Sequence, residues 1–146
     1  MSFLKYQKQS PEFLSNYLKY KRYIDFGAQT TTDETFFDLR TLFRYVKLYL
    51  YDKNKLVNIT KEEFKKIDIT DVTIEDLEKM NQNDLQNYLF FLDSTLENVS
   101  KTRNRKLASM KRLYEYLETN NLINVNPTKW MHSATIEKRQ PKYLDL

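Results

Sequence analysis

Glycine and proline are scarce in this chain, which has one glycine and three prolines among its 146 residues. Turns between β-strands depend on glycine for positive φ angles and on proline for a fixed φ, whereas helices joined by polar segments need little of either. Cysteine is absent, which excludes disulfides and thiolate metal sites. The sequence therefore predicts an all-α protein.

Apolar residues recur at helical spacing in four stretches. A compact bundle of four main helices with additional short helical segments accounts for this pattern. The main helices are predicted over residues 11–25, 32–51, 81–94 and 100–119.

Local signals suggest where these helices begin and end. Ser10 and Ser100 are expected to cap the first and fourth helices. Thr31 and Glu34 have the spacing of a capping box for the second helix. Gly27 suits a left-handed position just after the first helix.

The chain between the second and third main helices is polar and irregular over residues 52–72, with one possible helical turn in "TKEEFKKI". Thr73 is expected to cap a short helix after this stretch, and Asn81 or Asn83 the third main helix. We expect residues 1–132 to form one domain and residues 133–146, which lack periodicity, to form a linker.

The sequence shows neither a signal peptide nor an apolar run long enough to span a membrane, so we expect a soluble, cytoplasmic protein. It also lacks the residues of an active site. One glycine cannot build a phosphate-binding loop, and the single histidine, His132, is expected to be a partly buried side chain beside Trp130. We therefore expect no cofactor, no metal and no independent enzymatic activity.

Positive charge is concentrated near the C-terminal end. Residues 1–99 hold 14 Lys and Arg against 16 Asp and Glu, whereas residues 100–146 hold 10 against 4. On a helical wheel of residues 101–117, the predicted core face consists of Leu107, Met110, Leu113, Tyr114 and Leu117. The opposite face carries Lys101, Arg105, Ala108 and Arg112, flanked by Thr102, Ser109, Asn104 and Lys111.

A basic helix face with small polar side chains is typical of a helix that lies against duplex DNA, because Lys and Arg neutralise phosphates while Ser, Thr and Asn add short hydrogen bonds. Arg103 and Lys106 fall nearer the predicted core. The second helix carries a further basic line, Arg40, Arg44 and Lys47. Binding of an acidic protein partner by these helices is the alternative.

Several short motifs in this order resemble the N-terminal core-binding domain of tyrosine recombinases, the phage integrase and Xer group. The resemblance covers about residues 10–144. The matching positions are Thr31, Asp38, Leu39 and Arg40; Thr102, Asn104, Arg105, Leu107 and Ser109 to Arg112; Asn126-Pro127; and "KRQPKYL" near the end.

The resemblance implies a SAM-like domain that binds double-stranded DNA sequence-specifically and clamps one face of the duplex through its second and fourth helices. It further implies that a separate domain cuts and rejoins DNA through a covalent phosphotyrosine, and that recombinase subunits meet in a synaptic complex, although we expect the isolated domain to be monomeric. The expected DNA contacts are Thr31, Arg40, Arg44, Lys101, Thr102, Arg105, Ser109, Lys111 and Arg112, with Lys138 and Arg139 in the linker.

Overall fold

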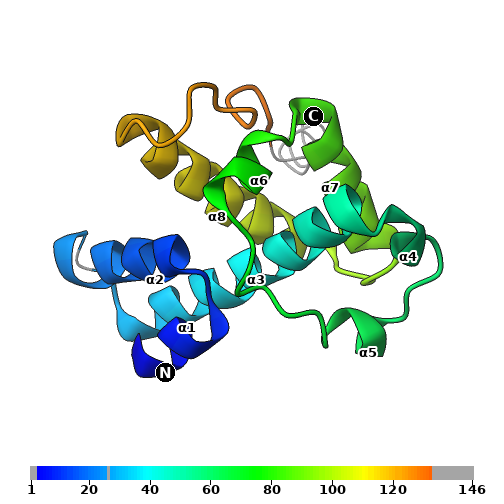
Figure 1. Ribbon diagram of the computed structural model, residues 1–146, viewed down its shortest axis with the longest axis horizontal. Coiled ribbons are helices and arrows are strands. Elements are labelled where there is room, and N and C mark those ends of the chain that lie inside the picture. Colours follow the sequence, from blue (N-terminus) through cyan, green and yellow to red (C-terminus); the bar gives the residue numbers. More distant parts are fainter. Residues whose placement is uncertain (1–2, 26, 133–146) are drawn as a thin grey trace, which may run out of the picture.

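The computed structural model describes residues 3–25 and 27–132 (Figure 1). Over these ranges the chain is helical and contains no strand, which confirms the predicted all-α bundle. The elements are α1 (Phe3–Gln9), α2 (Glu12–Lys19), the π-helix η1 (Tyr20–Ile24), α3 (Gln29–Tyr51), α4 (Lys53–Val57), α5 (Lys61–Phe64), α6 (Ile74–Glu78), α7 (Gln82–Ser94) and α8 (Ser100–Thr119).

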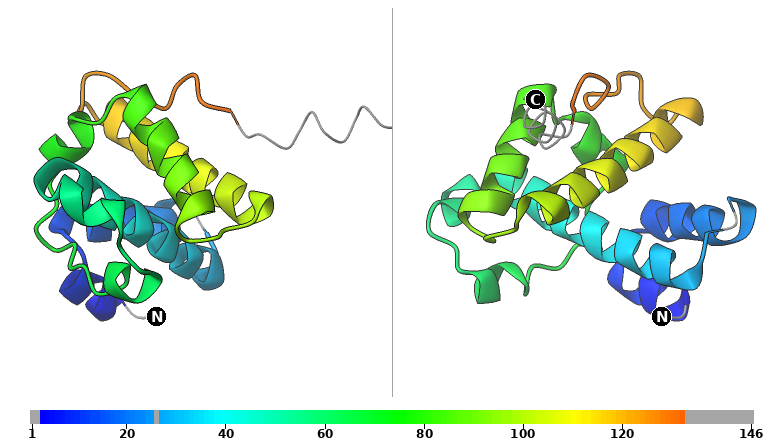
Figure 2. Two further views of the ribbon diagram at one scale, coloured as in Figure 1. Left: turned by 90° about the vertical axis from the view of Figure 1, so that its right-hand side faces the viewer. Right: turned by 180° about the vertical axis from the view of Figure 1, so that it is seen from behind.

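Helix α3 is the centre of the molecule, and α8 packs across it (Figures 1 and 2). The part of α3 that ends at Phe43 contacts α1 and α2, through ring contacts such as Tyr6 with Phe36 and Phe13 with Phe43. In the second half, Tyr45 contacts Tyr88 and Phe91 of α7. The predicted core face of α8 is buried in full, namely Leu107, Met110, Leu113, Tyr114 and Leu117.

Capping was predicted correctly for α6 and α7. Thr73 and Asn81 each accept a hydrogen bond from the third residue of the helix, and the acidic side chain there bonds back to the capping residue's backbone. These reciprocal bonds satisfy backbone N–H groups that a helix start leaves without partners. The possible turn in "TKEEFKKI" is α5, capped in the same way by Thr60.

The three capping predictions that involve Ser10, Thr31 and Ser100 are wrong. Helix α3 begins at Gln29, so Thr31 lies within its first turn, and the hydroxyl of Thr32 donates to the Ala28 carbonyl. Pro11 and Val99 occupy the capping positions of α2 and α8, and neither side chain can bond the helix. Ser100 is instead the first residue of α8.

Gly27 does not adopt the left-handed conformation that was predicted for it. Helix α2 continues into η1, where the N–H of Asp25 donates to the Tyr20 carbonyl and that of Gly27 to the Lys21 carbonyl. These wider hydrogen bonds satisfy the terminal carbonyls, so no residue with positive φ is needed there. Asn121 takes that role after α8, with a φ of 59°.

Two short helices and the exposure of His132 also differ from the predictions. Helices α1 and α4 have seven and five residues and were not predicted, because such short segments show no clear period. Trp130 and His132 are exposed, so the predicted partly buried histidine is wrong. No helix among the described residues is long and apolar enough to cross a membrane.

Candidate nucleic-acid interface

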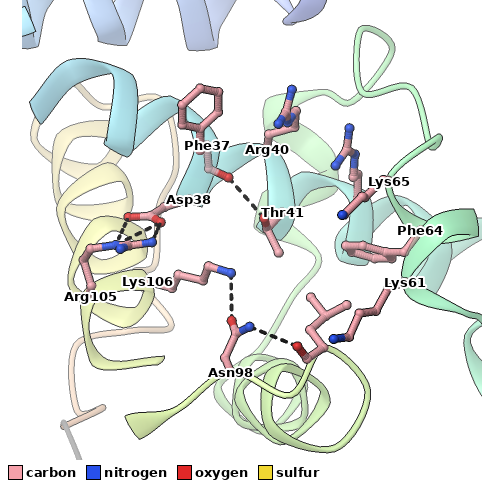
Figure 3. A pocket seen from close by; sticks show the side chains of 12 residues that line it. Phe37, Asp38, Arg40, Thr41, Lys61, Phe64, Lys65, Asn98, Arg105 and Lys106 are labelled. Carbon is pink, nitrogen blue, oxygen red and sulfur yellow. Dashed lines mark hydrogen bonds and ion pairs between the residues drawn. The ribbon is translucent and has the colours of Figure 1, made fainter. Parts of the chain in front are cut away.

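A groove of about 510 Å³ lies between α3, α5, the turn before α8 and the first turns of α8 (Figure 3). One carboxylate, Asp38, lines it. Its basic lining residues come from three separate segments of the chain, and they are Arg40, Arg44, Lys61, Lys65, Arg105 and Lys106. The groove is therefore a strongly cationic surface.

Asp38 is already engaged by α8 and leaves little negative charge for the groove. Its side chain is 1% exposed and accepts hydrogen bonds from Arg105 Nη2 and from Ser109 Oγ, each at 2.8 Å. The hydrogen bonds with Asp38 raise the pKa of Arg105. Arg105 ties α8 to α3 through this ion pair. Because its side chain is 48% exposed, it also presents positive charge to the groove.

Arg40 and Arg44 lie side by side on α3 and are both half-buried. The guanidinium of Arg40 lies 5.3 and 5.2 Å from the ring centres of Phe36 and Phe37, an arrangement that favours cation–π attraction. Burial, together with the charge of Arg40, lowers the pKa of Arg44 to about 10. Both groups remain charged at pH 7, so an anion between them would relieve their repulsion.

Lys47 and Lys111, which were predicted on basic helix surfaces, form hydrogen bonds within the fold. Lys47 Nζ donates to the Asp68 carbonyl at 2.8 Å and pairs with Asp71 at 2.9 Å. Lys111 Nζ donates to the Met131 carbonyl at 2.6 Å and so holds the segment after α8. Lys111 therefore stabilises the fold whatever else it contacts.

The remaining predicted DNA-contact residues lie outside the groove lining or outside the described residues. Thr31, Lys101 and Arg112 are exposed and Thr102 is half-buried, but none of them lines the groove. Ser109 is 4% exposed and donates its hydroxyl to Asp38, so it faces the interior of the α3–α8 contact. Lys138 and Arg139 lie outside the described residues.

The structure adds groove residues that the sequence did not single out. Lys106, which the helical wheel placed near the core, lines the groove and donates to Asn98 Oδ1 at 2.8 Å. Lys61 and Lys65 come from the polar stretch in which no periodic pattern was found. The lysine density of "TKEEFKKI" was the signal that could have identified them.

Comparison with known proteins supports the motif resemblance. The whole chain aligns, over 147 positions at 33% identity, with a protein described as Tyrosine recombinase XerC from Caldanaerobacter subterraneus subsp. tengcongensis. The resemblance to the tyrosine recombinases is confirmed. The chain spans 39% of the length of that recombinase, which fits its N-terminal region.

The tyrosine recombinase similarity fits a non-catalytic part of an enzyme and gives no support to the alternative of a module for acidic protein partners. No family model matches the chain, and no solved structure matches it. Nor do any three His, Cys, Asp or Glu side chains gather, within residues 3–25 and 27–132, as a metal site would require.

Proposed function

We propose that this chain is the DNA-binding domain of a tyrosine recombinase and that it holds duplex DNA on the face where α3 meets α8. The observation that carries the proposal is the groove between these helices, in which six basic side chains are accompanied by one carboxylate that is already paired. The similarity to a recombinase over the whole chain independently favours DNA as the ligand.

A cationic groove of this kind suits the DNA backbone, because each Lys or Arg that neutralises a phosphate releases condensed counterions. Arg105 is additionally fixed by Asp38 on its inner side, so little conformational entropy is lost when its outer side binds. Arginine also reads guanine through two parallel hydrogen bonds. Arg105 is therefore our candidate for a base contact, with Arg40 and Arg44 as phosphate contacts.

For the whole protein we propose the activity that its similarity implies, the cutting and rejoining of DNA at specific sites by assembled recombinase subunits. In that scheme this chain positions the duplex and contributes no reacting group. Ser109 and Lys111 support the fold of the binding surface, while Lys101 and Arg112 extend its charge along the exposed side of α8.

A salt titration of duplex binding by the 146-residue chain tests the proposal. Log Kd should change linearly with log salt, with about 0.9 in slope for each phosphate contact. The substitutions Lys101→Glu and Lys106→Glu together should weaken binding and lower that slope by roughly 1.8. Binding that is independent of salt, or unchanged in this variant, would contradict the proposal.

A matched control is available on the surface beyond the groove. Lys53 and Lys79 lie over the rings of Tyr49 and Tyr51, and both are exposed. The variant Lys53→Glu with Lys79→Glu changes the net charge by the same amount as the α8 variant. It should retain most of the affinity and the wild-type salt slope, which separates local contacts from the effect of overall charge.

A further inference from the structure

We propose that residues 61–69, here termed the lysine arm, form the second wall of the cationic groove of the protein. The arm would hold the phosphate backbone of one DNA strand against Arg40 and Arg44. This inference rests on the proposed function and extends it, because the motifs shared with recombinases lie on α3, on α8 and in the chain after α8, not in this arm. The arm comprises α5 and the loop that follows it.

The lysine arm is fixed at both ends and in its middle. Lys61 pairs with Glu97, in the turn before α8, at 2.8 Å. Phe64 is buried, and its ring centre lies 5.1 Å from that of Phe91. These contacts place α5 firmly opposite the start of α8, as Figure 3 shows for Phe64 and Lys61.

The C-terminal end of the arm is held by side chains of α3. Arg44 Nε donates to the Ile67 carbonyl at 3.0 Å, and Lys47 Nζ donates to the Asp68 carbonyl at 2.8 Å. Both bonds satisfy backbone oxygens of a segment that has no helix or strand partner there. The arm is thus a preorganised wall whose position is set by the same helix that carries the groove arginines.

A second hollow, of about 230 Å³, continues the groove along the arm towards α1. Arg40, Arg44 and Lys65 line both hollows, which makes the surface continuous from α8 to the end of α1. Together the two hollows are lined by eight cations, which are Lys8, Arg40, Arg44, Lys61, Lys65, Lys66, Arg105 and Lys106.

The carboxylates of these hollows are outnumbered. Asp38 and Asp68 line them against eight cations; Asp38 is paired with Arg105, and Asp68 is hydrogen-bonded to Thr70 and keeps its charge. Lys65 and Lys66 are exposed and form no ion pair with any described residue. Glu62 and Glu63, the other carboxylates of the arm, line neither hollow, so Lys65 and Lys66 add positive charge to the lining.

Arg40, which lines both hollows, has hydrogen-bonding capacity that the fold does not use. Arg40 Nε is buried and has no hydrogen-bond partner among the described residues, and its Nη1 reaches Gln9 Oε1 only at 3.5 Å. A nucleic-acid strand offers one negative charge per nucleotide, so its regular row of phosphates matches a line of cations better than a single small anion does. The arm and α3 together form such a line.

The experiment compares three double variants of the 146-residue chain for binding to a fluorescently labelled DNA duplex across a salt series. Lys65→Glu with Lys66→Glu alters the arm, Lys101→Glu with Lys106→Glu alters α8, and Lys53→Glu with Lys79→Glu is the charge-matched control. We expect the arm variant to bind more weakly, with a salt slope lowered by roughly 1.8, as for loss of two phosphate contacts. The control should keep the wild-type slope.

The outcomes separate the arm from the proposed function. Wild-type affinity and slope in the arm variant, with loss in the α8 variant, would overturn the arm and leave DNA binding intact. A wild-type chain that binds no duplex at any salt concentration would overturn both. If the arm variant melts at a lower temperature than the wild type, Lys65→Gln with Lys66→Gln replaces it and must show the same reduction in slope.

Discussion

Asp38 is the residue on which the two central helices depend most directly. Its carboxylate is buried, and α8 supplies both of its partners, Arg105 and Ser109. The pair is asymmetric: Asp38 has no access to water, whereas Arg105 is partly solvated. Removing the arginine would strand a buried charge, and removing the carboxylate would not.

This asymmetry predicts unequal effects on stability. Arg105→Met should lower the free energy of unfolding by about 3 kcal/mol, because the Asp38 carboxylate is left buried without a cation. The double variant Asp38→Asn with Arg105→Met should recover most of that loss, since no charge remains to be compensated. Urea unfolding at pH 7 measures both. A double variant no more stable than Arg105→Met would rule out this account of the pair.

The ion pair between Asp38 and Arg105 also affects the interpretation of DNA-binding experiments. Charge reversal at Arg105 would bring two carboxylates together inside the fold, so loss of binding could reflect unfolding. Substitutions at Lys65, Lys66, Lys101 or Lys106 avoid that difficulty, because none of these side chains contacts a buried charge at hydrogen-bond distance. Lys65, Lys66 and Lys106 line the two hollows and are therefore better tests of that surface, whereas Lys101 tests the exposed side of α8.

At the level of the helices, capping distinguishes the helix starts fixed by side chains from those fixed by packing. Asn81 makes a reciprocal pair of hydrogen bonds with Asp84 at the start of α7. Ser100 has the same kind of polar side chain, but its hydroxyl accepts from Arg103 Nη2 and bonds no N–H of the first turn of α8. The start of α8 is therefore held by tertiary contacts.

Matched alanine substitutions should reveal this difference. Asn81→Ala removes an acceptor from the first turn of α7 and should cost about 1 kcal/mol. Ser100→Ala leaves the backbone hydrogen bonds of α8 intact and should cost less than about 0.5 kcal/mol. Thermal or urea unfolding measures both. Equal losses in the two variants would mean that Ser100 does cap α8 in solution.

The helices that the sequence predicted best are those with long periodic faces. The five buried core positions of α8 followed from spacing alone, because burial of one helix face imposes a 3.6-residue period on the sequence. Helix α1 and helix α4 were missed, since a helix of two turns or fewer cannot display that period.

The groove could be predicted only in part, because it depends on contacts between distant segments. Arg40, Arg44 and Arg105 were found from charge and helical position, and all three line it. Lys61 and Lys65 could not be placed, because the arm is positioned by Phe64, Arg44 and Lys47 and not by its own pattern. Ser109 was assigned to the exposed side, since a helical wheel does not reveal a partner such as Asp38 on another helix.

At the scale of the whole molecule, buried tyrosines join the helices. Tyr17, Tyr45, Tyr88 and Tyr114 lie in the core between different helices. Burial raises the pKa of Tyr45 to about 12 and raises the pKa of the other three as well. Phenol groups that must stay neutral in the fold couple its stability to alkaline pH.

The sign of this coupling follows from the direction of the pKa shifts. An unfolded tyrosine loses its proton near pH 10, whereas the buried ones keep theirs in the fold. The folded state therefore binds more protons between about pH 10 and 12, and stability falls as the pH rises through that window. Each fully buried tyrosine should contribute a loss of up to about 1.4 kcal/mol per pH unit.

Tyr88→Phe provides the specific test. The Tyr88 hydroxyl is fully buried without a hydrogen-bond partner among the described residues, so its removal should stabilise the fold at pH 7 by about 1 kcal/mol. The variant should also lose less stability than the wild type between pH 10 and 11, because one buried phenol no longer titrates on unfolding. Urea unfolding across this range, with tyrosinate absorbance recorded in parallel, measures both effects. Identical pH dependence in the two proteins would show that Tyr88 ionises within the fold.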